Sequence, residues 1–161
     1  MMLPVLVVED RRRIAEQIVG LFKHIVGEND IIVETAPSVT QAKALIFTHS
    51  FSLVVVGGAL PEENGGRPES GAGLAFLDHL RETGFRGPAV FYSSCTQDVS
   101  CAATKSIAGM SVSSYIKTQT PNKLPPWNNQ NAVYATPSEL VFICCRLLKW
   151  SPCRKEDRGR Q

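Results

Sequence analysis

The sequence predicts an α/β fold in which a doubly wound sheet of five parallel strands carries helices on both faces. Two observations support this fold class. Five short apolar segments alternate with segments whose apolar residues recur every three or four positions. The strand-like segments are apolar at consecutive positions, as expected of strands buried on both faces of a parallel sheet. Strands and helices that alternate in this way need right-handed crossovers, which a doubly wound sheet provides.

The first strand and helix show the pattern most clearly. Residues 3–8 are a continuous apolar run, and residues 11–26 then carry one apolar stripe that ends at Gly27. The other strands are predicted at residues 31–34, 53–56, 88–92 and 112–116. The other helices are predicted at residues 39–47, from 74 to Gly84, at 99–108, and in a last segment capped by Thr136 and continuing to 150.

The length and composition predict a single domain over residues 1–150. The chain has 161 residues, of which 43% are hydrophobic, enough for one core. Two segments interrupt the alternation, a polar loop at 61–73 and an insertion at 118–135 before the last helix. Residues 151–161 are predicted to be a charged, flexible tail.

The charge and cysteine content exclude several classes of protein. The net charge of +2 does not call for a nucleic-acid partner. The five cysteines do not have the spacing of a zinc site and indicate reduced thiols. No apolar run is long enough for a membrane span, and no signal peptide begins the sequence. We therefore expect a cytoplasmic protein without a membrane partner.

Five segments in order resemble the receiver domain of response regulators, over about residues 3–117 and the last helix. They are LVVED at 6–10, LVVVGGALP at 53–61, SGAGLAFLDHLR at 70–81, PAVFYSS at 88–94 and SYIK at 114–117. Each lies at the end of a predicted strand or the start of the helix that follows. The resemblance implies the flavodoxin-like (βα)5 topology and a site at the carboxyl ends of the strands.

The resemblance also assigns roles to particular positions. Glu9 and Asp10 correspond to the acidic pair that holds magnesium in receivers. Ser93 corresponds to the hydroxyl residue that contacts the phosphoryl group, and Lys117 to the lysine that pairs with it. Tyr115 lies near the aromatic switch position.

The phosphoacceptor aspartate of the family is absent. By position it falls on Gly57, four residues before Pro61. Phosphoryl transfer to a receiver needs a carboxylate nucleophile, and Mg²⁺ needs several oxygen ligands. Without this side chain, Glu9 and Asp10 would hold magnesium weakly or not at all, and we expect no cofactor.

These features predict a degenerate receiver, or pseudo-receiver, in two-component or phosphorelay signalling. It would catalyse no reaction and would act through protein contacts that do not depend on phosphorylation. The expected partner is a histidine kinase or another signalling protein, or a second copy bound through the last strand and helix. The predicted switch and interface residues are Tyr115, Phe142, Leu147 and Trp150.

Several alternatives remain open at the level of sequence. Glu62 or Glu63 could serve as an unconventional phosphoacceptor, or the chain could be a small flavodoxin-like ligand-binding protein. Glu9 with Asp10 could be a solvated strand end, and Lys117 could form an ordinary ion pair. The arginines at 11–13, at a helix end that disfavours positive charge, could form a docking surface or a solvated charge run.

Overall fold

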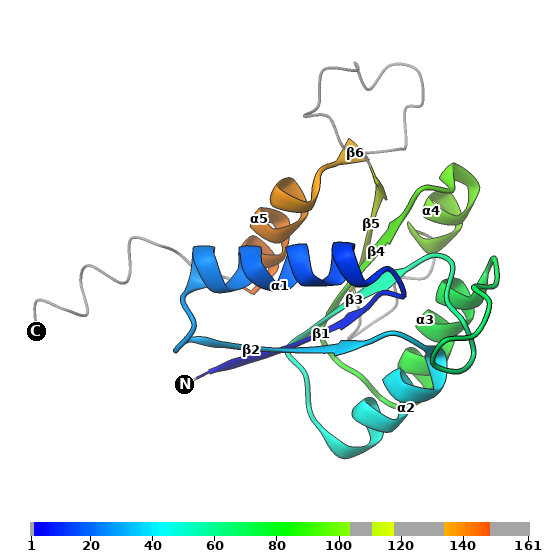
Figure 1. Cartoon of the computed structure of the whole chain (residues 1–161), viewed down its shortest axis with the longest axis horizontal. Helices are drawn as coiled ribbons and strands as arrows, with labels where there is room; N and C mark the ends of the chain where they lie inside the picture. The colour runs from blue at the N-terminus through cyan, green and yellow to red at the C-terminus, as the bar shows by residue number, and fades with distance from the viewer. Residues whose placement is uncertain (1, 104–110, 118–133, 149–161) are drawn as a thin grey trace, which may run out of the picture.

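The described part of the chain forms one parallel sheet between two layers of helices (Figure 1). The computed structural model describes residues 2–103, 111–117 and 134–148. The strand order is β2-β1-β3-β4-β5-β6, and all paired strands are parallel. The strands are β1 (Leu3–Val8), β2 (Ile31–Ala36), β3 (Leu53–Gly57), β4 (Pro88–Ser93), β5 (Ser111–Lys117) and β6 (Tyr134–Ala135). The helices are α1 (Arg12–Val26), α2 (Val39–Thr48), α3 (Ala72–Glu82), α4 (Thr96–Ala103) and α5 (Pro137–Leu147). The predicted fold class is confirmed.

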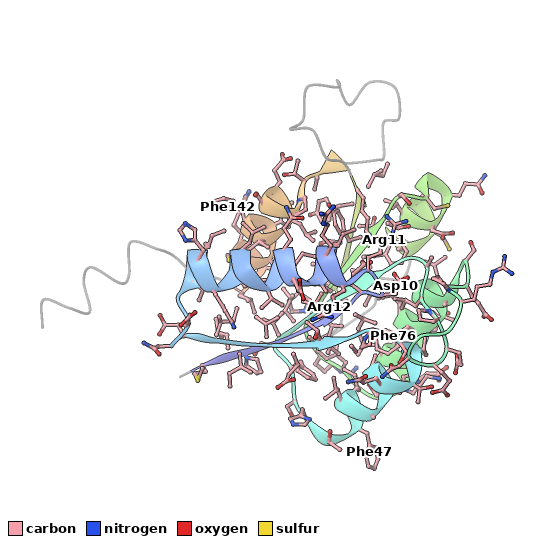
Figure 2. The ribbon with its side chains drawn as sticks, in the orientation of Figure 1. Asp10, Arg11, Arg12, Phe47, Phe76 and Phe142 are labelled. Carbon is pink, nitrogen blue, oxygen red and sulfur yellow. The ribbon has the colours of Figure 1, made fainter. Side chains whose placement is uncertain are left out.

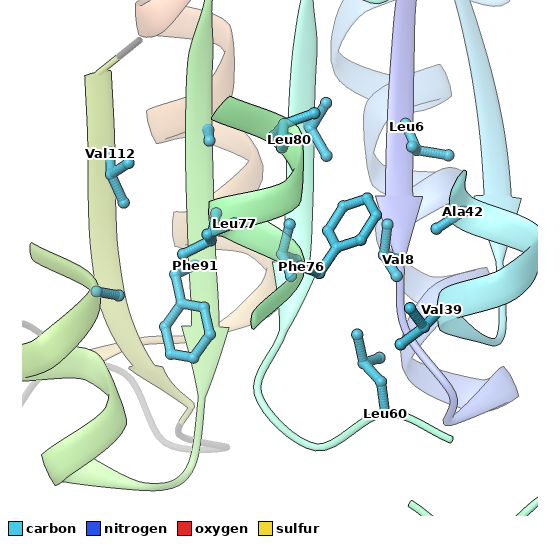
Figure 3. Packing of buried hydrophobic residues seen from close by; sticks show 14 of the residues in the cluster. Leu6, Val8, Val39, Ala42, Leu60, Phe76, Leu77, Leu80, Phe91 and Val112 are labelled. Atoms are coloured by element: carbon cyan, nitrogen blue, oxygen red, sulfur yellow. The ribbon is translucent and has the colours of Figure 1, made fainter. Parts of the chain in front are cut away.

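The central strands are buried on both faces, which explains their continuously apolar sequences. All five residues of β3 are buried. Val54 and Val56 pack in the cluster formed with α2, α3 and α4, whereas Leu53 and Val55 pack in the cluster formed with α1 and α5. Figure 3 shows the first cluster, in which Phe76 of α3 lies against the sheet. The two layers of helices therefore hold the strand ends in fixed positions.

Strand β6 extends the sheet beyond the predicted five strands. Residues 134 and 135 were assigned by sequence to the 118–135 insertion, but they pair with Ile116 and Lys117 of β5. The hydroxyl of Tyr92 donates a buried hydrogen bond of 2.9 Å to the carbonyl of Ala135. This bond anchors β6 to β4 across β5. The rest of the insertion and the predicted tail lie outside the described residues.

The beginning of α5 agrees with the sequence prediction, although the helix ends at Leu147 and was predicted to continue to 150, and the beginning of α4 differs from the prediction. Thr136 and Glu139 form a capping box, in which each side chain accepts a hydrogen bond from the other's backbone N–H. In contrast, α4 begins at Thr96, before the predicted start at residue 99. The amide of Val99 donates to the carbonyl of Cys95, so the first turn is already helical. Among the described helices, none is both long and apolar enough to cross a bilayer.

Candidate functional site

Four of the predicted site residues lie where parallel strands end at the same edge of the sheet. Glu9 follows β1, Gly57 ends β3, Ser93 ends β4 and Lys117 ends β5. In an open α/β sheet the carboxyl ends of the strands form the usual binding crevice. The structure thus brings together residues that are up to 108 positions apart in the chain.

Glu9 and Lys117 form an ion pair at this edge. Glu9 Oε2 accepts a hydrogen bond from Lys117 Nζ at 2.9 Å, and its Oε1 accepts a longer one of 3.3 Å from the Arg11 amide. The side chain of Glu9 is only 3% exposed, while that of Lys117 is 18% exposed. The ammonium group of Lys117 also lies 5.4 Å from the centre of the Tyr92 ring, within the range of a cation–π contact. Lys117 is therefore held by two partners.

The carboxylate of Glu9 fills space beside Gly57. A β-carbon built on Gly57 would lie 2.8 Å from Glu9 Oε2 and 3.3 Å from the carbonyl oxygen of Val8. The first distance is shorter than real contacts of this kind. Residue 57 can therefore lack a side chain without leaving a void, because Glu9 reaches into the adjacent volume.

Two more glycines let the backbone close tightly around the site. A β-carbon on Gly58 would collide with the hydroxyl of Ser93. At the start of α3, Gly73 donates its amide to the carbonyl of Gly58 at 3.0 Å. A β-carbon on Gly73 would collide with the carbonyl of Gly57 and lie 2.9 Å from that of Gly58. The end of β3 and the first turn of α3 are thus in direct backbone contact.

A cavity of about 160 Å³ lies beside Lys117. Its lining includes side chains of both signs of charge, the acidic Asp10 and Asp98 and the basic Arg11 and Lys117. Ser93 also lines it, although this residue is buried and its hydroxyl accepts a hydrogen bond of 3.1 Å from the Cys95 amide. The cavity is large enough for a few water molecules or a small anion.

Burial raises the pKa of Glu9 above its ordinary value. The Lys117 ammonium and the amide of Arg11 oppose this shift, and the nearby Asp10 adds to it. Desolvation is the largest cause, because the side chain of Glu9 has little contact with water. The negative charge of Glu9 therefore depends on its ion pair with Lys117.

The residues present do not fit a magnesium site. Both oxygens of Glu9 already accept hydrogen bonds, one of them from a cation. Gly57 offers no ligand, which leaves Asp10 and Asp98 as the carboxylates that line the cavity. Across the described ranges, no three acidic, histidine or cysteine side chains converge to hold a metal. Mg²⁺ requires near-octahedral oxygen coordination, and this donor set does not supply it.

Tyr92 is a site residue that sequence reasoning missed. It stacks under Lys117 and donates to Ala135, and burial, together with the charges of Glu9 and Glu139, raises its pKa to about 12. The available signal was its position directly before Ser93 on a buried strand. That placement puts the ring on the α1–α5 side of the sheet, opposite the serine.

The loop after β3 carries Glu62 and Glu63 away from the cavity. The carbonyls of Pro61 and Glu62 accept hydrogen bonds of 3.0 Å from the amides of Val39 and Thr40, the first residues of α2. The carboxylate of Glu63 accepts a hydrogen bond of 2.9 Å from the Thr40 hydroxyl. Neither glutamate lines the cavity. These contacts disfavour both residues as phosphoacceptors.

The described members of the predicted switch and interface set lie on β5 and α5 and take no part in the ion pair. Tyr115 and Leu147 are half-buried against the α1–α5 cluster. Phe142 projects from α5 and is 55% exposed (Figure 2). Trp150 lies outside the described residues. The apolar surface predicted for this helix is therefore represented by one exposed ring.

Comparisons with known proteins bear on the fold. No protein-family model matches the sequence, and no curated protein matches it significantly. Solved structures do match. The receiver domain of an HD domain-containing protein from Pseudomonas fluorescens Pf-5 aligns with a TM-score of 0.60 at 13% identity, covering 92% of this chain and 96% of that one. The chain has the receiver fold.

Other solved receivers lead to the same result. A two-component response regulator from Clostridium difficile gives a TM-score of 0.58 at 15% identity, covering 92% of this chain and 97% of that one. The receiver domain of Francisella response regulator 1452 gives 0.51 at 22% identity, with coverage of 68% and 82%. At these identities the likeness establishes the receiver fold alone, and function has to be argued from the site.

Proposed function

We propose that this chain is a receiver-like signalling module of the two-component type that acts by contact with a protein partner, without being phosphorylated. It would catalyse no reaction of its own. The observation that carries the proposal is the position of Glu9, whose carboxylate lies beside Gly57 and pairs with Lys117.

Phosphorylation of a receiver requires groups that neither position 57 nor the Glu9–Lys117 pair supplies. A carboxylate must attack the donor in line, and a metal must offset the charge of the phosphoryl group. Position 57 has no nucleophile, and both oxygens of Glu9 are engaged. The ion pair instead gives the strand ends a fixed arrangement that does not need a phosphoryl group.

The partner surface that we propose is the face formed by β5 and α5. Phe142 is a large apolar side chain exposed there, and aromatic anchors of this kind dominate binding energy at protein interfaces. Tyr115 of β5 and Leu147 of α5 are half-buried against the α1–α5 cluster. A histidine kinase or another signalling protein is the partner class that the fold suggests.

The first test is treatment of the purified chain with Mg²⁺ and acetyl phosphate, and separately with beryllofluoride. A receiver that retains its aspartate serves as positive control. We expect no mass adduct, and no change in the amide chemical shifts of Glu9, Asp10, Ser93 and Lys117. An adduct would overturn the proposal, and peptide mapping to Glu62 or Glu63 would establish the unconventional acceptor instead.

A further inference from the structure

The α1 side of the sheet is incompletely covered at its β2 edge. Two helices, α1 and α5, pack on this face, whereas three helices pack on the other. A groove of about 550 Å³ lies between α1 and β2. Val33 is half-buried and Thr35 is exposed there, although both stand on a strand whose β1 neighbours are buried. None of the described residues fills the groove.

The wall that α1 contributes to this groove has small residues at its centre. Ala15, Val19 and Gly20 line it, and a β-carbon built on Gly20 would meet no atom within 4 Å. Small side chains allow another helix to approach closely. A glycine in the middle of a helix costs about 1 kcal/mol relative to alanine, so a packing role would account for its presence.

The charges on the same wall are self-complementary. Glu16 and Lys23 both line the groove and are both exposed. Glu16 pairs with Arg12 at 2.8 Å, whereas no ion pair within the described ranges reaches Lys23. The two charges are seven positions apart and about 10 Å along the helix axis. The midpoint between them falls between Val19 and Gly20.

We propose that the groove between α1 and β2 is the interface of a symmetric homodimer, in which the two α1 helices pack antiparallel. A twofold axis between Val19 and Gly20 brings each Glu16 level with the partner's Lys23, and each Val19 level with the partner's Gly20. Both ion pairs form at once, because the interface uses the same patch on each copy. Each helix then covers the exposed β2 residues of the other copy.

The arginine run at the start of α1 fits this arrangement. Arg11, Arg12 and Arg13 lie at the positive end of the helix, and the first turn carries no acidic residue. Antiparallel packing places them beside the negative end of the partner's helix and level with the exposed Glu28 that follows it. The positive charges of the three arginines are therefore unfavourable in the monomer and favourable in the dimer.

This inference does not depend on the proposed function, because the groove lies at the β2 edge of the sheet and the proposed partner surface lies at β5 and α5, toward the other edge. The measurement is sedimentation equilibrium over a range of concentrations. We expect a dimer for the natural sequence and a monomer for Gly20→Gln, which blocks close approach of the helices. Because nothing surrounds the added side chain in one copy, this variant should unfold at the same or a higher denaturant concentration.

A charge exchange tests the register. Lys23→Glu and Glu16→Lys should each weaken association by about tenfold, since two attractive contacts become repulsive. The double variant should regain most of the affinity. Lys43→Glu changes the net charge by the same amount as Lys23→Glu but lies on α2, on the other side of the sheet, so it should have little effect.

Two outcomes would overturn the inference. One is a natural protein that remains monomeric at all concentrations. The other is a dimer that tolerates Gly20→Gln and dissociates with Phe142→Ser, which would place the contact on α5.

Discussion

Glu9 Oε2 lies 2.9 Å from Lys117 Nζ and 2.8 Å from the point where a β-carbon on Gly57 would stand. These two distances couple positions 9, 57 and 117. A residue with a side chain at 57 must displace the glutamate, and a displaced glutamate must give up the lysine. Changes at the three positions should therefore have effects that are far from additive.

Restoring an aspartate at the acceptor position should not by itself rebuild the pocket. Gly57→Asp is expected to destabilise the protein by about 1–3 kcal/mol, because the new side chain overlaps with Glu9. Adding Glu9→Asp shortens the competing side chain and should recover much of this loss. Urea unfolding of the single and double variants measures the coupling. Costs that simply add would show that the two side chains do not compete.

Removing the lysine should expose the cost of burying Glu9. Lys117→Met is expected to lower the free energy of unfolding by about 2–4 kcal/mol. This is toward the lower end of the range for breaking a buried ion pair, because the side chain of Lys117 is partly exposed. Glu9→Gln combined with Lys117→Met should cost less than the lysine change alone, since no charge is then left unpaired. Chemical denaturation at neutral pH distinguishes the variants. Equal losses would mean that the ion pair contributes little.

The raised pKa of Glu9 predicts a pH dependence of stability. The folded protein holds this proton at a higher pH than the unfolded chain, whose ordinary value is 4.5. The stabilisation is therefore complete below about that value and is lost as pH rises through the folded pKa. The difference in unfolding free energy between the natural protein and Glu9→Gln should fall as pH rises toward neutrality. If this difference in unfolding free energy grew over the same range, the pKa of Glu9 would be lowered in the folded protein and the prediction would be wrong.

Tyr92 should contribute to the stability of the fold although it does not line the cavity. Tyr92→Phe removes the donor to the buried carbonyl of Ala135 and should cost about 1–2 kcal/mol. Its pKa of about 12 also predicts a loss of stability as pH rises from 10 toward 12. Ultraviolet titration of the natural protein against the variant isolates this phenol. Ionisation near pH 10 would contradict the burial of this phenol.

Two helical glycines should respond in opposite ways to alanine. Gly73→Ala places a methyl group against the carbonyls of Gly57 and Gly58 and should cost at least about 2 kcal/mol. Gly20→Ala meets nothing and should stabilise the monomer by up to about 1 kcal/mol. Thermal unfolding at low protein concentration compares them. Similar effects at both positions would mean that α3 does not pack closely on the end of β3.

The sequence predicted the regular part of the fold well because burial on both faces leaves a simple mark. A strand such as β3 has no polar position, and α1 has one continuous apolar stripe. Strand β6 has only two residues, which is too few for a hydrophobic periodicity, and it is held by a hydrogen bond from Tyr92 that the sequence does not indicate. The start of α4 was also misplaced, because its first turn is polar.

The candidate site was predictable in position but not in conformation. Strand ends alone indicate that Glu9, Gly57, Ser93 and Lys117 lie near one another. The direction of the Glu9 side chain depends on a lysine 108 positions away and on space left by a glycine. No local pattern encodes such a contact. That these residues do not respond to a phosphodonor stays a prediction.

The pairing of β5 with β6 has a consequence for protein engineering. Ile116 lies opposite Tyr134 and Lys117 opposite Ala135, so the described residues on either side of segment 118–133 lie on neighbouring strands, which are spaced about 5 Å apart. The entropy of closing a loop between fixed points grows only with the logarithm of its length. Peptides of very different size could therefore be spliced between these anchors, and the junction offers a place to display foreign epitopes on this scaffold.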